Sequence, residues 1–76
     1  MKEFTTNDIV KTASAEQLEK LFKLSHELGD VIEQILVQNT SFNRYTERLA
    51  YCPDFCKVQM LETGAMAEMS NRAKNK

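Results

Sequence analysis

The chain has 76 residues, with ten Lys and Arg against eleven Asp and Glu, so its net charge is −1. Hydrophobic residues make up 42% of it, which is too much apolar material for a disordered chain. The length allows one small domain and excludes the Rossmann and barrel folds. Domains this short gain stability from disulfides, a metal or a second subunit. Two Cys and one His offer little for the first two, so we expect self-association.

The near-neutral charge is a cancellation between two halves. Residues 1–38 hold four Lys against seven Asp and Glu, a net −3, and residues 39–76 hold six Lys and Arg against four acids, a net +2. Opposite halves can pair within one chain or across a dimer. The first six residues lack the apolar segment that a signal peptide contains. The longest aliphatic run, Ile35 to Val37, is too short to span a bilayer. We therefore expect a cytoplasmic protein with no membrane partner.

Helical periodicity dominates the sequence, and strand alternation is absent. The residues from Thr5 to Asp8 offer N-caps for a short helix over about 6–13. Ser14 and Gln17 read as a capping box that opens a long helix over 15–38.

One face of this long helix is apolar over about half of its circumference, which is wider than a single neighbouring helix requires. We infer at least two neighbours, one of them in a second subunit. Ser25 and Gly29 allow a close helix approach on this face, although Gly29 could also be tolerated at a cost of about 1 kcal/mol. The apolar face comprises Leu18, Leu21, Phe22, Leu24, Ser25, Leu28, Gly29, Val31, Ile32, Ile35 and Leu36.

The polar run from Asn39 to Ser41 favours a break or kink, followed by a helix over 41–51. The alternative is a continuous helix to Tyr51, in which Asn39 would specify the register of a coiled coil.

Pro53 disfavours helix at the residue before it, so the chain turns there. Pro53 or Asp54 then starts a last helix, over about 54–71. Residues 71–76 read as a frayed basic tail. The sequence thus predicts a single helical domain over residues 1–70.

Cys52 and Cys56 form the most conspicuous cluster of reactive residues. A structural zinc needs four ligands, usually from closely spaced pairs, and no second pair is present. These cysteines are weak candidates for a metal site shared across a dimer or for a redox disulfide. Thiols packed at a helix junction are the favoured interpretation, and we expect no metal and no cofactor.

His26 lies beside Glu27 and one helical turn before Asp30 on the charged side of the long helix. This position predicts an exposed histidine. The alternative is a pH-sensitive contact. The other carboxylates read as a solvated helix face rather than a general acid and base, so we expect no enzymatic activity.

Basic residues in the C-terminal half are candidates for phosphate contacts, namely Arg44, Arg48 and Lys57, together with Arg72, Lys74 and Lys76. A recognition helix would need a helix-turn-helix context, and the acidic exposed side of the long helix would repel a phosphate backbone. Direct nucleic-acid binding is therefore the less favoured hypothesis.

These patterns predict an all-α protein: a small helical bundle or hairpin with one long amphipathic helix, completed by dimerisation. The leading hypothesis is a small non-enzymatic helical regulator or adaptor that binds a larger protein and masks or remodels its surface. The alternative is a nucleic-acid-binding accessory or transcription-regulatory protein that uses its basic C-terminal half. The predicted interface residues are Leu24, Leu28, Val31, Ile32, Ile35, Phe42, Tyr45, Leu49 and Met60.

Overall fold

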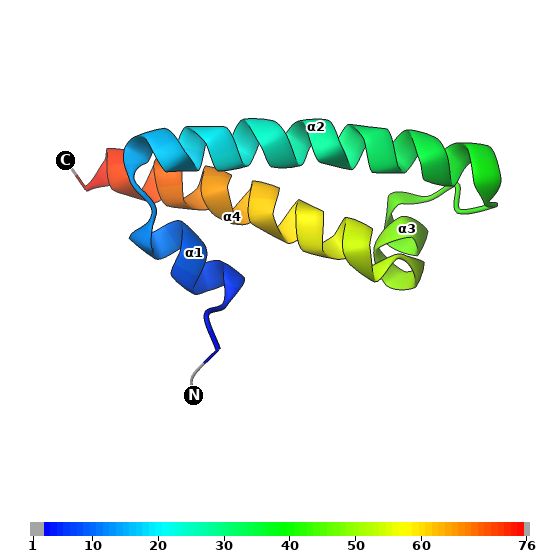
Figure 1. Cartoon of the computed structure of the whole chain (residues 1–76), viewed down its shortest axis with the longest axis horizontal. Coiled ribbons are helices and arrows are strands. Elements are labelled where there is room, and N and C mark those ends of the chain that lie inside the picture. The colour runs from blue at the N-terminus through cyan, green and yellow to red at the C-terminus, as the bar shows by residue number, and fades with distance from the viewer. Residues whose placement is uncertain (1–2, 76) are drawn as a thin grey trace.

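Two long helices of opposite direction lie side by side in the computed structural model, which describes residues 3–75 (Figure 1). Within this range there are four α-helices and no strand, so the predicted all-α class is confirmed. α2 and α4 form the main helix pair, and the short α1 and α3 both pack on α4 near its two ends. The helices are α1 (Thr6–Thr12), α2 (Ala15–Asn39), α3 (Tyr45–Tyr51) and α4 (Pro53–Lys74).

The first two helices each begin with a capping box. The Thr5 hydroxyl accepts the Asp8 amide at 3.2 Å, and the Asp8 carboxylate accepts the Thr5 amide at 3.0 Å. This backbone hydrogen bond, with the Thr5 hydroxyl, lowers the pKa of Asp8. Ser14 and Gln17 exchange the same two bonds at 3.1 and 2.8 Å, so the capping box predicted there is confirmed. Both boxes satisfy amides that a helix start leaves unpaired.

The chain leaves α2 after Asn39, where the sequence favoured a break. The Thr40 hydroxyl donates to the Leu36 carbonyl at 2.6 Å and accepts the Phe42 amide at 3.2 Å, which diverts the backbone from the helix. A continuous helix to Tyr51 is therefore not what the structure shows.

The next helix begins at Tyr45, later than the predicted residue 41. The Asn43 amide bonds the Ser41 carbonyl at 2.9 Å, so this segment forms a turn instead of a first helical turn.

The last helix is longer than predicted at its C-terminal end. Pro53 occupies its first turn, and the helix continues to Lys74, so the prediction of a frayed tail is wrong for Asn71–Lys74. Arg72 explains the difference because its guanidinium bonds Glu68 at 2.9 Å and the Ala13 carbonyl at 2.8 Å. Lys76, the end of the predicted tail, lies outside the described residues.

The hydrophobic core lies where α1, the start of α2 and the end of α4 meet. Val10, Leu18 and Ala65 are buried there. At the other end of α4, Phe55 is buried with Tyr45 against its ring edge, the centroids 5.8 Å apart. Each buried Leu or Phe side chain contributes about 1.5–3 kcal/mol, so these contacts hold the short helices to α4.

Between these two clusters, α2 approaches α4 closely at Ser25 and Gly29, which are both buried. A Cβ on Gly29 would lie 2.6 Å from Nε2 of Gln59, a residue of α4. The close approach predicted from these small residues is confirmed. No helix within residues 3–75 combines the length and apolar character needed to cross a bilayer.

Candidate protein-binding surfaces

One apolar face of α2 is not covered by the rest of the chain. We call it the α2 stripe, and its residues follow one another at alternating intervals of three and four positions. All but the half-buried Leu21 are between 50% and 62% exposed. This spacing is that of a coiled-coil seam, and apolar patches of this kind mark sites of protein contact. The α2 stripe comprises Leu21, Leu24, Leu28, Val31 and Ile35.

A groove of about 430 Å³ continues the α2 stripe at its N-terminal end. We call it the α1–α2 groove. It shares Leu21 and Leu24 with the stripe, and Phe4, Ile9 and Ala13 supply most of its opposite apolar wall. The stripe and this groove therefore form one continuous apolar surface.

A second groove, of about 350 Å³, lies between α3 and α4. We call it the α3–α4 groove. The Tyr45 hydroxyl donates to Oε1 of Gln59 at 2.7 Å, which fixes two of its lining residues against each other. Met60 is exposed there, and a methionine can adapt its shape to a bound surface. The groove is lined by Tyr45, Leu49, Cys56, Gln59, Met60, Thr63 and Gly64.

The nine predicted interface residues do not form one surface. Those of the α2 stripe are Leu24, Leu28, Val31 and Ile35, whereas Tyr45, Leu49 and Met60 line the α3–α4 groove.

The other two, Ile32 and Phe42, lie outside both surfaces and are half-buried, as Leu49 also is within its groove. The Phe42 ring stacks on that of Tyr51, with the ring centroids 5.3 Å apart. The expected single seam along the helix is interrupted because the chain turns at Thr40.

Phe4 and Ile9 also line the α1–α2 groove, although neither is among the predicted interface residues. A signal for them was present. Phe4 directly precedes the N-cap Thr5, and Ile9 is the fourth residue of the helix, the two positions of a hydrophobic staple.

His26 bridges α2 and α4. Its Nδ1 lies 3.2 Å from the Glu62 carboxylate and its Nε2 lies 3.7 Å from that of Asp30, while the ring stacks on Phe22. The hydrogen bond to Glu62, then the charge of Asp30, raises the pKa of His26. The sequence indicated Asp30 but not Glu62, which lies 36 positions away.

The candidate phosphate contacts differ in their surroundings. Arg48 is paired with Glu33 at 3.0 Å and donates to the Phe42 carbonyl at 3.0 Å, and only 11% of its side chain is exposed. These bonds tie α3 to α2 and leave Arg48 poorly placed to contact a phosphate. Arg44 and Lys57 are exposed.

Cys52 and Cys56 are both free thiols, half-buried at the junction of α3 and α4. Within residues 3–75, no three or more His, Cys, Asp or Glu side chains gather as metal ligands. Comparisons of the chain with models of protein families, with curated proteins and with solved structures found no match.

Proposed function

We propose that this chain is a small non-enzymatic regulator or adaptor that binds a larger protein and acts as a homodimer, in which two chains complete a helical bundle. One observation carries the proposal: the chain leaves two apolar surfaces uncovered, the α2 stripe and the α3–α4 groove, which share no residue. Contiguous exposed apolar surface on a small protein is typical of contact sites.

The two surfaces suit different partners. The α2 stripe is straight and has heptad spacing, so it suits a long helix lying along it. The α3–α4 groove is short and contains the exposed Met60, so it suits one or two anchoring side chains from a larger protein. Self-association through the first surface leaves the second available for the larger protein.

A protein partner is better supported than a nucleic acid. Arg48 and Arg72 are engaged with Glu33 and Glu68 inside the chain. Among the described residues of the predicted basic set, this leaves Arg44, Lys57 and Lys74 exposed. These few cations supply little of the counterion release that drives phosphate binding.

The experiment is affinity capture from the native host with the wild-type chain and two variants. Met60→Glu places a charge in the α3–α4 groove, and Val37→Glu places the same charge at an equally exposed apolar position on α2, outside both surfaces. We expect wild type and Val37→Glu to capture the same larger protein and Met60→Glu to lose it. Calorimetry with the purified proteins then compares the affinities of the three chains for the captured protein.

An identical set of captured proteins for all three chains contradicts the proposal. So does salt-dependent binding to duplex DNA that Arg44→Ala abolishes, since this result favours the nucleic-acid function.

A further inference from the structure

We infer that the occupant of the α2 stripe is a second copy of this chain, whose α2 runs antiparallel so that Lys20 lies opposite the partner's Glu27. The inference rests on the proposed function, because it names the first partner of a surface already assigned to protein binding. It is carried by the spacing of the stripe and by the order of charges beside it.

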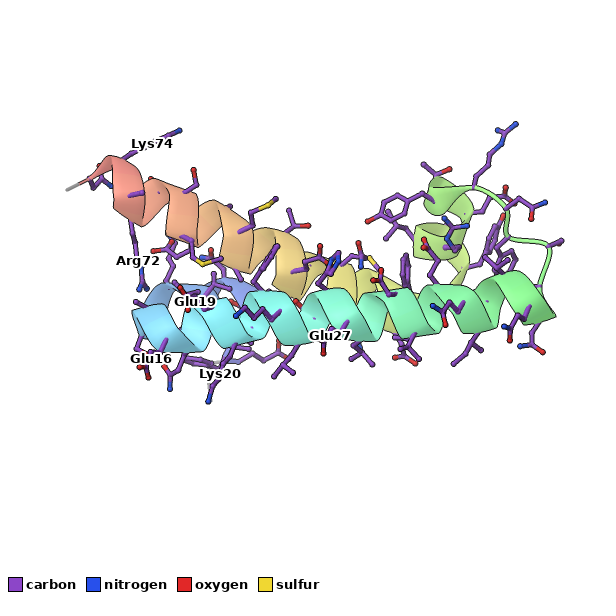
Figure 2. All side chains as sticks on the ribbon, turned by 90° about the horizontal axis from the view of Figure 1, so that it is seen from above. Glu16, Glu19, Lys20, Glu27, Arg72 and Lys74 are labelled. Carbon is purple, nitrogen blue, oxygen red and sulfur yellow. The ribbon has the colours of Figure 1, made fainter. Side chains whose placement is uncertain are left out.

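The heptad spacing assigns a role to each flank of the stripe. With Leu21, Leu28 and Ile35 at a positions and Leu24 and Val31 at d positions, Lys20 and Glu27 both occupy g positions. Both are exposed, and neither takes part in an ion pair among residues 3–75. Figure 2 shows Lys20 on the side of α2 away from α4.

The other flank of the stripe carries no charge. Its e positions are Leu18, Ser25 and Ile32, which turn toward α4 and are buried or half-buried. Charges at the interface can therefore come only from the g flank.

This one-sided distribution selects the orientation of the partner. In a parallel pair each g residue faces an e residue, so Lys20 and Glu27 would meet only uncharged side chains. In an antiparallel pair g faces g, and Lys20 meets the partner's Glu27 once on each side of the two-fold axis. Opposite charges thus favour the antiparallel arrangement, and a net charge of −1 per chain adds little repulsion.

In the same register the centre of the stripe packs on itself, with Leu21 level with the partner's Leu24 and Leu24 level with the partner's Leu21. The two-fold axis then passes between Leu21 and Leu24, and Val31 comes level with the partner's Ser14. The partner's Ser14 lies beside the partner's α1–α2 groove, so the C-terminal half of the stripe can contact Phe4 and Ile9 of the partner subunit there. The charge pairs therefore form together with the Leu21–Leu24 contacts, while Leu28 comes level with the partner's Gln17, which lines that groove.

The first experiment measures the mass of the chain in solution by light scattering at micromolar concentration. We expect wild type at twice the chain mass of 8.7 kDa. Leu28→Lys should give a monomer, whereas the control Val37→Lys, an equally exposed apolar position of α2, should remain a dimer. A monomeric wild type, or equal dissociation by both variants, overturns the inference.

The second experiment exchanges charges at exposed positions, where the fold is retained, as circular dichroism will verify. Lys20→Glu and Glu27→Lys each replace two attractive pairs by two repulsive ones, and we expect each to raise the dimer Kd by about tenfold at low salt. An equimolar mixture of the two variants should restore the wild-type Kd. Unchanged affinity in both single variants overturns the proposed register.

The third experiment fixes the orientation by disulfide cross-linking, with Cys52→Ser and Cys56→Ala removing the native thiols. A mixture of Lys20→Cys and Glu27→Cys chains should cross-link, and each variant alone should not. No cross-linking in the mixture, or cross-linking of either variant alone, indicates another orientation or register and overturns the inference. Met60→Glu capture remains a separate test, so a failure of the dimer is distinguishable from a failure of the proposed function.

Discussion

Arg72, near the end of α4, donates to the Ala13 carbonyl at 2.8 Å, in the turn between α1 and α2. The same nitrogen reaches the carbonyls of Val10 and Lys11 at 3.4 and 3.3 Å. A helix leaves its last carbonyls unpaired, and a cation near them is favourable. Figure 2 shows Arg72 extending from α4 toward this turn. One side chain thus joins α4 to the end of α1 and to the turn that leads into α2, at the end of the molecule that holds the core.

We expect Arg72→Met to lower the free energy of unfolding by about 1–2 kcal/mol, because carbonyls that a charged donor satisfied lose it. Methionine retains the apolar stem of the side chain. Lys74→Met is the control, since Lys74 lies in the same turn, is exposed and points elsewhere in Figure 2. Urea unfolding of both variants measures the difference. Equal midpoints would show that the end of α4 is as dispensable as a frayed tail.

Arg72 also shows where sequence reasoning stops. Ser14 and Gln17 are three positions apart, so their capping box can be recognised locally, and the apolar periodicity of α2 is likewise local. Arg72 and Ala13 are 59 positions apart, and nothing in the local sequence connects them. The last helix was therefore predicted too short.

The candidate surfaces could likewise be predicted only as far as they depend on local sequence patterns. The width of the apolar face on α2 indicated a second neighbour, but which residues α4 covers depends on the tertiary approach at Gly29. Leu28 therefore remains in an exposed stripe while Ile32, one turn later, is half-buried. The α3–α4 groove was not predicted because its walls come from two helices that are joined by a turn at Cys52.

Gly64→Ala should stabilise the protein by about 0.5–1 kcal/mol, since glycine within a helix costs that much relative to alanine. The space for a methyl group exists: an added Cβ would lie 3.5 Å from Cγ1 of Val10, an ordinary packing distance. Thermal unfolding measures the change. Gly64→Leu is the contrasting variant, because a larger side chain must push α1 away. Destabilisation by alanine would indicate that α1 packs more tightly on α4 than this distance implies.

Arg48→Ala should lower the free energy of unfolding by about 1–3 kcal/mol, because it leaves Glu33 and the Phe42 carbonyl without their partner. Arg44→Ala, one helical turn earlier and exposed, should change it by less than about 0.5 kcal/mol. Denaturant titration of both variants gives the comparison. If the two substitutions have equal effects on stability, Arg48 does not anchor α3 to α2.

The contact of His26 with Glu62 predicts a stability that depends on pH. The Glu62 carboxylate, Asp30 and Glu27 all raise the pKa of His26 above its ordinary value of 6.5, so the folded chain favours the protonated ring. A raised folded pKa gives a stabilisation that is fully present below the ordinary value and is lost as the pH rises through the raised value. The α2–α4 contact at this point is therefore stronger in mildly acidic solution.

We expect wild type to be more stable than His26→Gln at about pH 5.5, and the difference to shrink as the pH is raised toward about 9. Glu62→Gln should remove more of this pH dependence than Asp30→Asn, because the bond to Glu62 is the larger cause of the raised pKa. Unfolding curves of the four proteins across this range test both statements. A wild-type advantage that grows with rising pH would mean that the neutral ring, rather than the protonated one, is the form that the α2–α4 contact selects.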